Sequence, residues 1–183
     1  RKGAKVVAVS DINGAIYNLE GLDWDALKTV IPETGKAAKL WNRDYKGGQV
    51  LNGAELFKLD VDILVPGARP DVITMKNVKD VKAKMVLEAA NVPATREAEK
   101  YLGDKGVLVV PDFIANAGGV IAGAVEVRGG TIEESFQVIK RKIHENVKAV
   151  LDMADKEKIH PRDAAERLAR GRVMLAMKDK GRI

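Results

Sequence analysis

Segments rich in small and polar residues follow four short apolar runs of this sequence, and they are the positions best suited to contact a ligand. They include Asp11 after the first run, Gly67 and Ala68 after the second, Asn91 after the third, and Asn116 and Gly118 after the fourth. A carboxylate accepts hydrogen bonds from hydroxyl groups, a primary amide both donates and accepts, and glycine lets the backbone approach a ligand closely. These residue types predict that the segments bind a polar ligand, but they would suit many different polar ligands.

The segment after the fourth run is the most informative of these. The run Val107–Val110 leads into Pro111-Asp112 and then into Asn116-Ala117-Gly118-Gly119. An apolar run that ends at Pro and leads to paired glycines is typical of the end of a parallel strand that presents its backbone to a ligand. Asn91 and Asn116 also suit turns or helix caps, and Asn116 is a candidate N-cap. Capping and ligand binding are compatible roles.

Other kinds of site find little support. The sequence has no cysteine, so it can form neither a disulfide nor a thiolate metal site. The two histidines, His144 and His160, are not spaced as a metal pair, and His160 directly before Pro161 is better placed to cap a helix than to catalyse. No nucleophile elbow or P-loop occurs. We therefore predict no metal site and no catalytic residue in this chain.

The apolar runs predict strands that alternate with helices. The runs are Lys5–Ser10, Val61–Val65, Lys84–Glu88 and Leu108–Val110. Runs of this length with helical connections predict an α/β fold, with an open, mostly parallel sheet and helices on both faces. In such sheets the ligand lies beyond the carboxyl ends of the strands. Asn13-Gly14 also predicts a type I′ hairpin, from which Ala15–Tyr17 returns as a short antiparallel strand.

Capping signals and periodicity predict the helices. Expected helices lie near Trp24–Val30 and Lys36–Trp41, after a capping box at Asn52 through Leu59, from Thr95 to Leu102, from a capping box at Thr131 to Ala154, and from Pro161 to Met177. An apolar stripe that includes Phe136 and Ile143 runs along the Thr131 helix, so both side chains are expected to be structural. We expect residues 1–130 to form one α/β domain and residues 131–183 to form helices that pack on it.

Composition limits the function. With 183 residues, 46% hydrophobic and 31% charged, the chain has the composition of a folded globular protein. The net charge is +5, but basic residues alternate with acidic ones, as on solvated helix faces, so no nucleic-acid partner is expected. No apolar run is long enough to span a membrane, so no membrane partner is expected. The absence of cysteine suits the cytoplasm.

The order and wording of several motifs resemble one family over essentially the whole chain. These motifs are Val7–Asp11 through Gly14, Leu59–Pro66, Pro111-Asp112, Asn116–Gly119, and Arg162–Ala165 leading to Ala176-Met177. They resemble the cofactor-binding domain of glutamate, leucine, phenylalanine and valine dehydrogenases, with glutamate dehydrogenase the most similar. The resemblance implies NAD-dependent oxidative deamination of an L-amino acid to a 2-oxo acid and ammonia. It also implies that NADP is a possible cofactor and that the parent protein is a homo-oligomer, a hexamer in this family.

The resemblance also implies roles for single residues. Asp11 would accept hydrogen bonds from the adenosine ribose and so favour NAD, although a turn aspartate is the alternative. The remaining cofactor positions would be Ile12, Gly67, Ala68, Asn91, Asn116 and Gly118, with the two asparagines beside the nicotinamide half. Val120 and Gly123 would line the substrate pocket. Because glutamate-specific members have a serine where this chain has Gly123, a smaller or apolar amino acid competes with glutamate as the substrate.

Parts of the family pattern are missing. No two glycines have the G-x-G spacing that binds pyrophosphate, and the chain begins at Arg1 within a strand-forming segment. We therefore expect residues 1–130 to form a partial, N-terminally truncated dinucleotide-binding domain of the Rossmann type, and residues 131–183 to pack on it and toward a missing substrate domain. The resemblance places the catalytic lysine and aspartate in that missing domain, so the chain is expected to be inactive alone. The alternative is a non-catalytic dinucleotide-binding or regulatory module. The family's usual Asn-Gly-Pro after the third strand is replaced by Asn91-Val92-Pro93.

Overall fold

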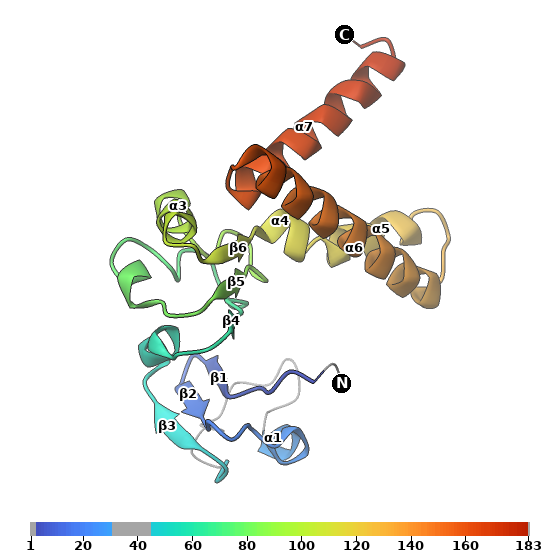
Figure 1. Ribbon diagram of the computed structural model, residues 1–183. Helices are drawn as coiled ribbons and strands as arrows, with labels where there is room; N and C mark the ends of the chain where they lie inside the picture. The colour runs from blue at the N-terminus through green and yellow to red at the C-terminus, as the bar shows by residue number, and fades with distance from the viewer. Residues whose placement is uncertain (1–2, 31–44, 183) are drawn as a thin grey trace. The chain divides into compact units, whose positions relative to one another are not determined.

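A computed structural model describes residues 3–30 and 45–182 of the chain (Figure 1). The chain divides into two compact units, residues 1–60 with 80–82, and residues 61–79 with 83–183. Each unit is described by itself. The helix expected at Lys36–Trp41 lies outside the described residues, and the domain division at residue 130 stays a prediction.

The first unit contains a three-stranded antiparallel sheet. Its strands β1 (Ala8–Asp11), β2 (Gly14–Tyr17) and β3 (Gln49–Leu51) lie in the order β1-β2-β3. Helix α1 (Trp24–Val30) packs beside it, and the buried core of this unit consists of Ile16, Leu27 and Tyr45. The hydroxyl of Tyr45 accepts a hydrogen bond from the Asp23 N–H at 2.9 Å, which fixes the start of α1. The predicted α1 is confirmed.

The hairpin between β1 and β2 is confirmed, but its predicted turn was wrong. Asp11 pairs with Gly14, so Ile12 and Asn13 form the turn. A type I′ turn needs positive φ at both central residues, and among the described residues positive φ here occurs only at Gly14, with φ of 134°. The Asp11 carboxylate accepts hydrogen bonds from the Asn13 N–H at 2.7 Å and from Asn13 Nδ2 at 3.1 Å. Asp11 therefore stabilises its own turn.

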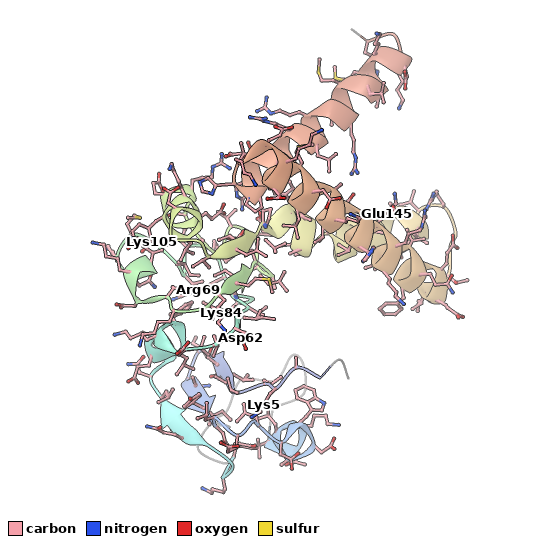
Figure 2. The ribbon with its side chains drawn as sticks, in the orientation of Figure 1. Lys5, Asp62, Arg69, Lys84, Lys105 and Glu145 are labelled. Atoms are coloured by element: carbon pink, nitrogen blue, oxygen red, sulfur yellow. The ribbon has the colours of Figure 1, made fainter. Side chains whose placement is uncertain are left out.

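The second unit contains a parallel sheet, which confirms the α/β class with a Rossmann-like arrangement. Strands β4 (Ile63–Leu64), β5 (Met85–Leu87) and β6 (Leu108–Val110) lie in the order β4-β5-β6 (Figure 1). At their amino ends, Lys84 Nζ lies 2.8 Å from Asp62 Oδ1 (Figure 2). The four predicted strands are thus divided between two sheets, because the first of them pairs in an antiparallel hairpin.

Side-chain caps start the helices where the sequence predicts. Asn52 and Glu55 form the expected capping box of a 3₁₀ helix, η1 (Gly53–Lys58), one residue shorter than predicted. Thr95 caps α3 (Arg96–Asp104), and Thr131 caps α6 (Ile132–Glu157) by accepting from the Glu134 N–H. Pro161 is the first residue of α7 (Pro161–Asp179). A second 3₁₀ turn, η2, covers Val78–Asp80.

The helices of the second unit pack around β6. Helix α4 (Asp112–Ala115) follows β6 directly, α5 (Gly118–Glu126) comes next, and both contact α6, while α3 and α7 pack against β6 (Figure 1). A buried core between α4, α6 and α7 consists of Ile114, Val150, Ala154, Ala164 and Ala165. The two adjacent alanines at the start of α7 bring the backbones of α6 and α7 close together.

The predicted structural role of the whole α6 stripe is only partly supported. Val150 is 1% exposed, but Phe136 is 68% exposed and Ile132 is 78% exposed. Helical periodicity identifies the apolar face correctly, but it does not tell what covers each turn. In this structure the carboxyl-terminal half of α6 packs in the core, and the first two turns do not.

We expect Val150→Ala to lower the free energy of unfolding of this chain by about 1–3 kcal/mol, because it opens a cavity in a buried core. Phe136→Ala should change it by less than about 0.5 kcal/mol, because an exposed side chain loses few contacts. Urea unfolding followed by far-ultraviolet circular dichroism measures both. A larger effect at Phe136 than at Val150 would contradict this assignment.

Candidate functional site

The carboxyl ends of β4, β5 and β6 meet at one edge of the parallel sheet. The Pro66 carbonyl, after β4, accepts hydrogen bonds from the Ala89 and Ala90 N–H groups, after β5, at 3.2 and 2.9 Å. Gly67 lies directly beside this turn, since a Cβ built on it would be 3.7 Å from the Ala89 Cβ. The segments expected to contact a ligand after the second and third apolar runs are therefore neighbours. Ligands of open α/β sheets bind at this edge.

Asn91 and Asn116 form a pair at this edge. Asn116 Nδ2 donates a hydrogen bond to Asn91 Oδ1 at 2.7 Å, and the pair is exposed to solvent. Within the described residues, Asn91 Nδ2 and Asn116 Oδ1 make no hydrogen bond, so one donor and one acceptor remain for a ligand. The structure therefore brings together two residues that are 25 positions apart in the sequence.

The expected N-cap role of Asn116 is wrong. Asn116 is the C-cap of α4, where its N–H donates to the Asp112 carbonyl at 2.7 Å. Ala117 occupies the N-cap position of α5 and makes no side-chain cap. The short α4 therefore ends just before α5 begins, and the Asn116 side chain is left to pair with Asn91.

The turn that carries Asn91 has an unusual backbone. Val92 adopts φ of 47°, the left-handed region that disfavours a β-branched side chain. The Val92 N–H donates to Asp112 Oδ2 at 2.8 Å, and the Val92 carbonyl accepts from the Asp71 N–H at 3.0 Å. The Val92 side chain itself is 51% exposed, so its own packing does not hold it there. The two backbone hydrogen bonds hold this conformation.

A buried ionic cluster lies beneath the same turns. Arg162, on α7, donates through Nη2 to Glu88 Oε2 and Asp112 Oδ1, both at 2.9 Å, and through Nε to Glu99. The three carboxylate side chains are at most 9% exposed, and that of Arg162 is 14% exposed. Arg162 also lies over the Phe113 ring, with its guanidinium carbon 5.4 Å from the ring centroid. One guanidinium thus connects the residue after β5, α3 and α4 to α7.

Burial and crowding change the protonation of this cluster. Desolvation and the nearby Glu99 carboxylate raise the pKa of Glu88 to about 8, although Arg162 opposes them. Glu88 Oε2 accepts from Arg162 and from the Asp112 N–H, while its Oε1 is buried without a hydrogen-bond partner among the described residues. An ionised Glu88 would leave that oxygen charged and bare. Glu88 is therefore protonated at neutral pH.

Asp112 and Arg162 stay charged. Burial tends to raise the pKa of Asp112, but hydrogen bonds from the Val92 and Phe113 backbone and from Arg162 outweigh it, so this pKa is lowered. Burial tends to lower the pKa of Arg162, but its hydrogen bonds and ion pairs, first with Glu99, raise it further. The sequence reasoning missed this cluster, because no local pattern distinguishes these charged residues from solvated ones.

The remaining candidate residues belong to the first unit and to α5 of the second unit. Asp11 and Ile12 belong to the first unit, where Ile12 is 92% exposed. Gly118 begins α5, and a Cβ built on it would lie 3.7 Å from Ile139 Cγ2 of α6. Val120 is 80% exposed, and a Cβ built on Gly123 would meet no atom within 4 Å. The expected substrate residues therefore have open space in front of them.

The structure contradicts the capping role expected for His160. His160 occupies the N-cap position of α7 without capping it, and its Nε2 lies 3.1 Å from Asp104 Oδ1. Its ring packs so closely against Gly103 that a Cβ there would collide with it.

In the part of the chain that the structure describes, no group of three acidic, histidine or cysteine side chains is arranged to hold a metal ion. None of the helices within that part is long and apolar enough to cross a membrane.

Comparisons with known proteins agree on one family. Residues 1–181 match the family described as Glutamate/Leucine/Phenylalanine/Valine dehydrogenase. The chain is 44% identical to a glutamate dehydrogenase of Aeropyrum pernix over 189 residues, and 38% identical to that of Thermotoga maritima over 185 residues. Each match covers 98% of this chain but only 44% and 43% of those proteins. The chain thus spans less than half the length of these relatives.

A solved structure supports the same relationship. The hetero-hexameric glutamate dehydrogenase of Thermus thermophilus, in its Leu-bound form, superposes with a TM-score of 0.78 and 30% sequence identity. That match covers 96% of this chain and 42% of the other.

Proposed function

Because this chain belongs to the glutamate/leucine/phenylalanine/valine dehydrogenase family, we propose that it forms the coenzyme-binding part of an NAD(P)-dependent amino-acid dehydrogenase, most similar to glutamate dehydrogenase. The reaction would be oxidative deamination of an L-amino acid to a 2-oxo acid and ammonia. The observation that carries the proposal is the Asn91–Asn116 pair at the carboxyl edge of the parallel sheet.

The chemistry of this pair fits the nicotinamide half of the cofactor. A bound nicotinamide dinucleotide supplies the acceptor for the substrate hydride. Its carboxamide and ribose hydroxyls need both donors and acceptors, which Asn91 Nδ2 and Asn116 Oδ1 can provide. The pair would fix the orientation of the ring, and Gly67, Ala68 and Gly118 would allow the cofactor to approach the backbone closely.

NAD is the proposed cofactor, with NADP as the alternative. The Asp11 carboxylate would accept a hydrogen bond from the 2′-hydroxyl of the adenosine ribose, whereas a 2′-phosphate would bring like charges together. Ile12 would contact the adenosine beside it.

The substrate pocket would include Val120 and Gly123 on the exposed face of α5. Without a hydroxyl at Gly123, this wall favours an apolar amino acid as much as glutamate. The general base would come from outside these 183 residues, so the chain by itself is proposed to be inactive. The parent protein is proposed to be a cytoplasmic homo-oligomer. The hexameric assembly of the Thermus relative supports an oligomer, although that relative is hetero-hexameric.

The test is the substitution Asn116→Ala, made in the complete protein that the gene encodes. We expect the KM for the dinucleotide to rise about tenfold, the size of one lost polar contact, while the KM for the amino acid stays within a factor of about two. Asn146→Ala is the matched control, because Asn146 on α6 only accepts a surface hydrogen bond from Arg172. Steady-state kinetics with the dinucleotide and the amino acid varied in turn give both constants.

The same measurements separate the two candidate functions. Turnover of an amino acid with NAD or NADP supports the dehydrogenase. Dinucleotide binding that Asn116→Ala weakens, without turnover of any amino acid, would replace it with the non-catalytic binding module. An unchanged KM in Asn116→Ala would remove the asparagine pair from the cofactor site.

A further inference from the structure

The strained turn at Val92 needs an explanation, because nothing in its own side chain favours it. A valine at φ of 47° places its branched Cβ against the backbone, and such conformations persist only where the surroundings enforce them. They are most common where a protein holds residues in a functional geometry. Val92 lies directly between Asn91, of the asparagine pair, and the buried Pro93.

Asp112 connects this turn to the rest of the site. Its Oδ2 accepts the Val92 N–H at 2.8 Å, and its Oδ1 accepts Arg162 Nη2 at 2.9 Å. The Asp112 N–H donates to Glu88 Oε2 at 3.0 Å, so its backbone is held as well. Asp112 is also the first residue of α4, whose C-cap is Asn116. One carboxylate therefore holds the Asn91 turn from the same short helix that carries Asn116.

We propose that Asp112 is a positioning residue for the cofactor site: its carboxylate, anchored by Arg162, holds Val92 in the left-handed conformation that places Asn91 against Asn116. This inference rests on the proposed function of the asparagine pair. Asp112 itself need not touch the cofactor, because its side chain is 9% exposed and both of its oxygens serve the protein.

An amide side chain at position 112 cannot accept both of these hydrogen bonds. In Asp112→Asn the side chain keeps one oxygen and gains an NH₂ group, so either the Val92 N–H or Arg162 faces a donor. Because the charged guanidinium of Arg162 binds the remaining oxygen more strongly than a backbone N–H does, the Val92 N–H loses its acceptor and the turn relaxes toward negative φ. We expect the KM for the dinucleotide to rise about tenfold, while the KM for the amino acid changes little.

Glycine at position 92 provides the decisive comparison. Glycine adopts positive φ without steric cost, so the turn no longer needs the carboxylate. In Asp112→Asn with Val92→Gly, the KM for the dinucleotide should return to within about threefold of the parent protein. Val92→Ala is the matched control, because alanine keeps the Cβ that causes the strain and should not rescue. Val92→Gly alone should leave the KM unchanged.

If Asp112→Asn acted only by lowering the stability of the whole protein, glycine at position 92 would not restore the KM for the dinucleotide. The proposal is overturned if Val92→Gly fails to rescue Asp112→Asn, or if Val92→Ala rescues it equally well. Hydrogen exchange of the peptide that contains Val92 gives a readout without cofactor. Its amide should exchange faster in Asp112→Asn, and unchanged exchange would also overturn the proposal.

Failure of the proposed function would look different. If Asn116→Ala leaves the KM for the dinucleotide unchanged, the asparagine pair does not bind the cofactor. The exchange measurement still decides whether Asp112 holds the Val92 turn, because it depends only on the protein. Faster exchange in Asp112→Asn would then support the positioning role without a cofactor site.

Discussion

Replacing Arg162 with methionine should lower the free energy of unfolding of the second unit by about 3–5 kcal/mol at pH 7. The substitution keeps most of the apolar length of the side chain but removes the only cation that contacts Glu88, Glu99 and Asp112 among the described residues. Removal of one partner from a buried ion pair leaves the other charge desolvated and uncompensated. Here one substitution removes the cation that faces the ionised Asp112 carboxylate and that also holds Glu99 and Glu88.

Urea unfolding followed by far-ultraviolet circular dichroism is the suitable measurement. The chain has two tryptophans, Trp24 and Trp41, and both precede the second unit, so tryptophan fluorescence would report on the wrong part. Arg167→Met is the matched control on the same helix. Arg167 contacts Glu157 at the surface, with 59% and 40% of the two side chains exposed, so its loss should be below about 0.5 kcal/mol. Equal effects of the two variants would contradict the structural role of Arg162.

The second large effect is a loss of stability as the pH rises. The pKa of Glu88 is raised from 4.5 to about 8 in the folded chain. Below pH 4.5, Glu88 is protonated in both states; above it, the unfolded state loses the proton while the folded state retains it. The contribution of Glu88 is therefore fully present below pH 4.5 and is lost as the pH rises to about 8. Between pH 5 and 8 the decrease should be at most about 4 kcal/mol.

Glu88→Gln tests this directly, because glutamine resembles the protonated acid. The free energy of unfolding of the variant should not fall between pH 5 and 8. The variant should therefore be no more stable than the parent at pH 5 but clearly more stable than the parent at pH 8. Glu157→Gln, in the exposed pair with Arg167, should leave the slope unchanged. Asp112 does not mask the effect, because its lowered pKa removes stability only in more acidic solutions. Parallel pH profiles for the parent and Glu88→Gln would disprove a buried protonated Glu88.

The features that the sequence predicted correctly depend on neighbouring residues. Thr95, Thr131 and Pro161 mark helix starts because each acts within four residues of its own position. The strand ends were located well enough to predict that Asn91 and Asn116 lie at the same edge, because parallel strands end together. What they bind stays a prediction.

The features that were missed depend on distant residues. The partners of Arg162 lie 50, 63 and 74 positions away, and no spacing rule links them. Helical periodicity could not reveal that nothing covers Phe136. The hairpin turn was misplaced by one residue, because Gly14 adopts positive φ after the turn instead of within it. Val92 was noted as a departure from the usual Asn-Gly-Pro, and its positive φ shows why glycine suits that position.

The long chain separations within the Arg162 cluster also affect the order of folding. Hairpins and single helices form within microseconds, whereas contacts that close loops of 50 to 74 residues must wait until most of the unit has assembled. Bonds made after the rate-limiting step do not change how fast a protein folds, but they determine how slowly it unfolds. We therefore expect the Arg162 contacts to form late in folding, so that they slow the unfolding of the second unit more than they speed its folding.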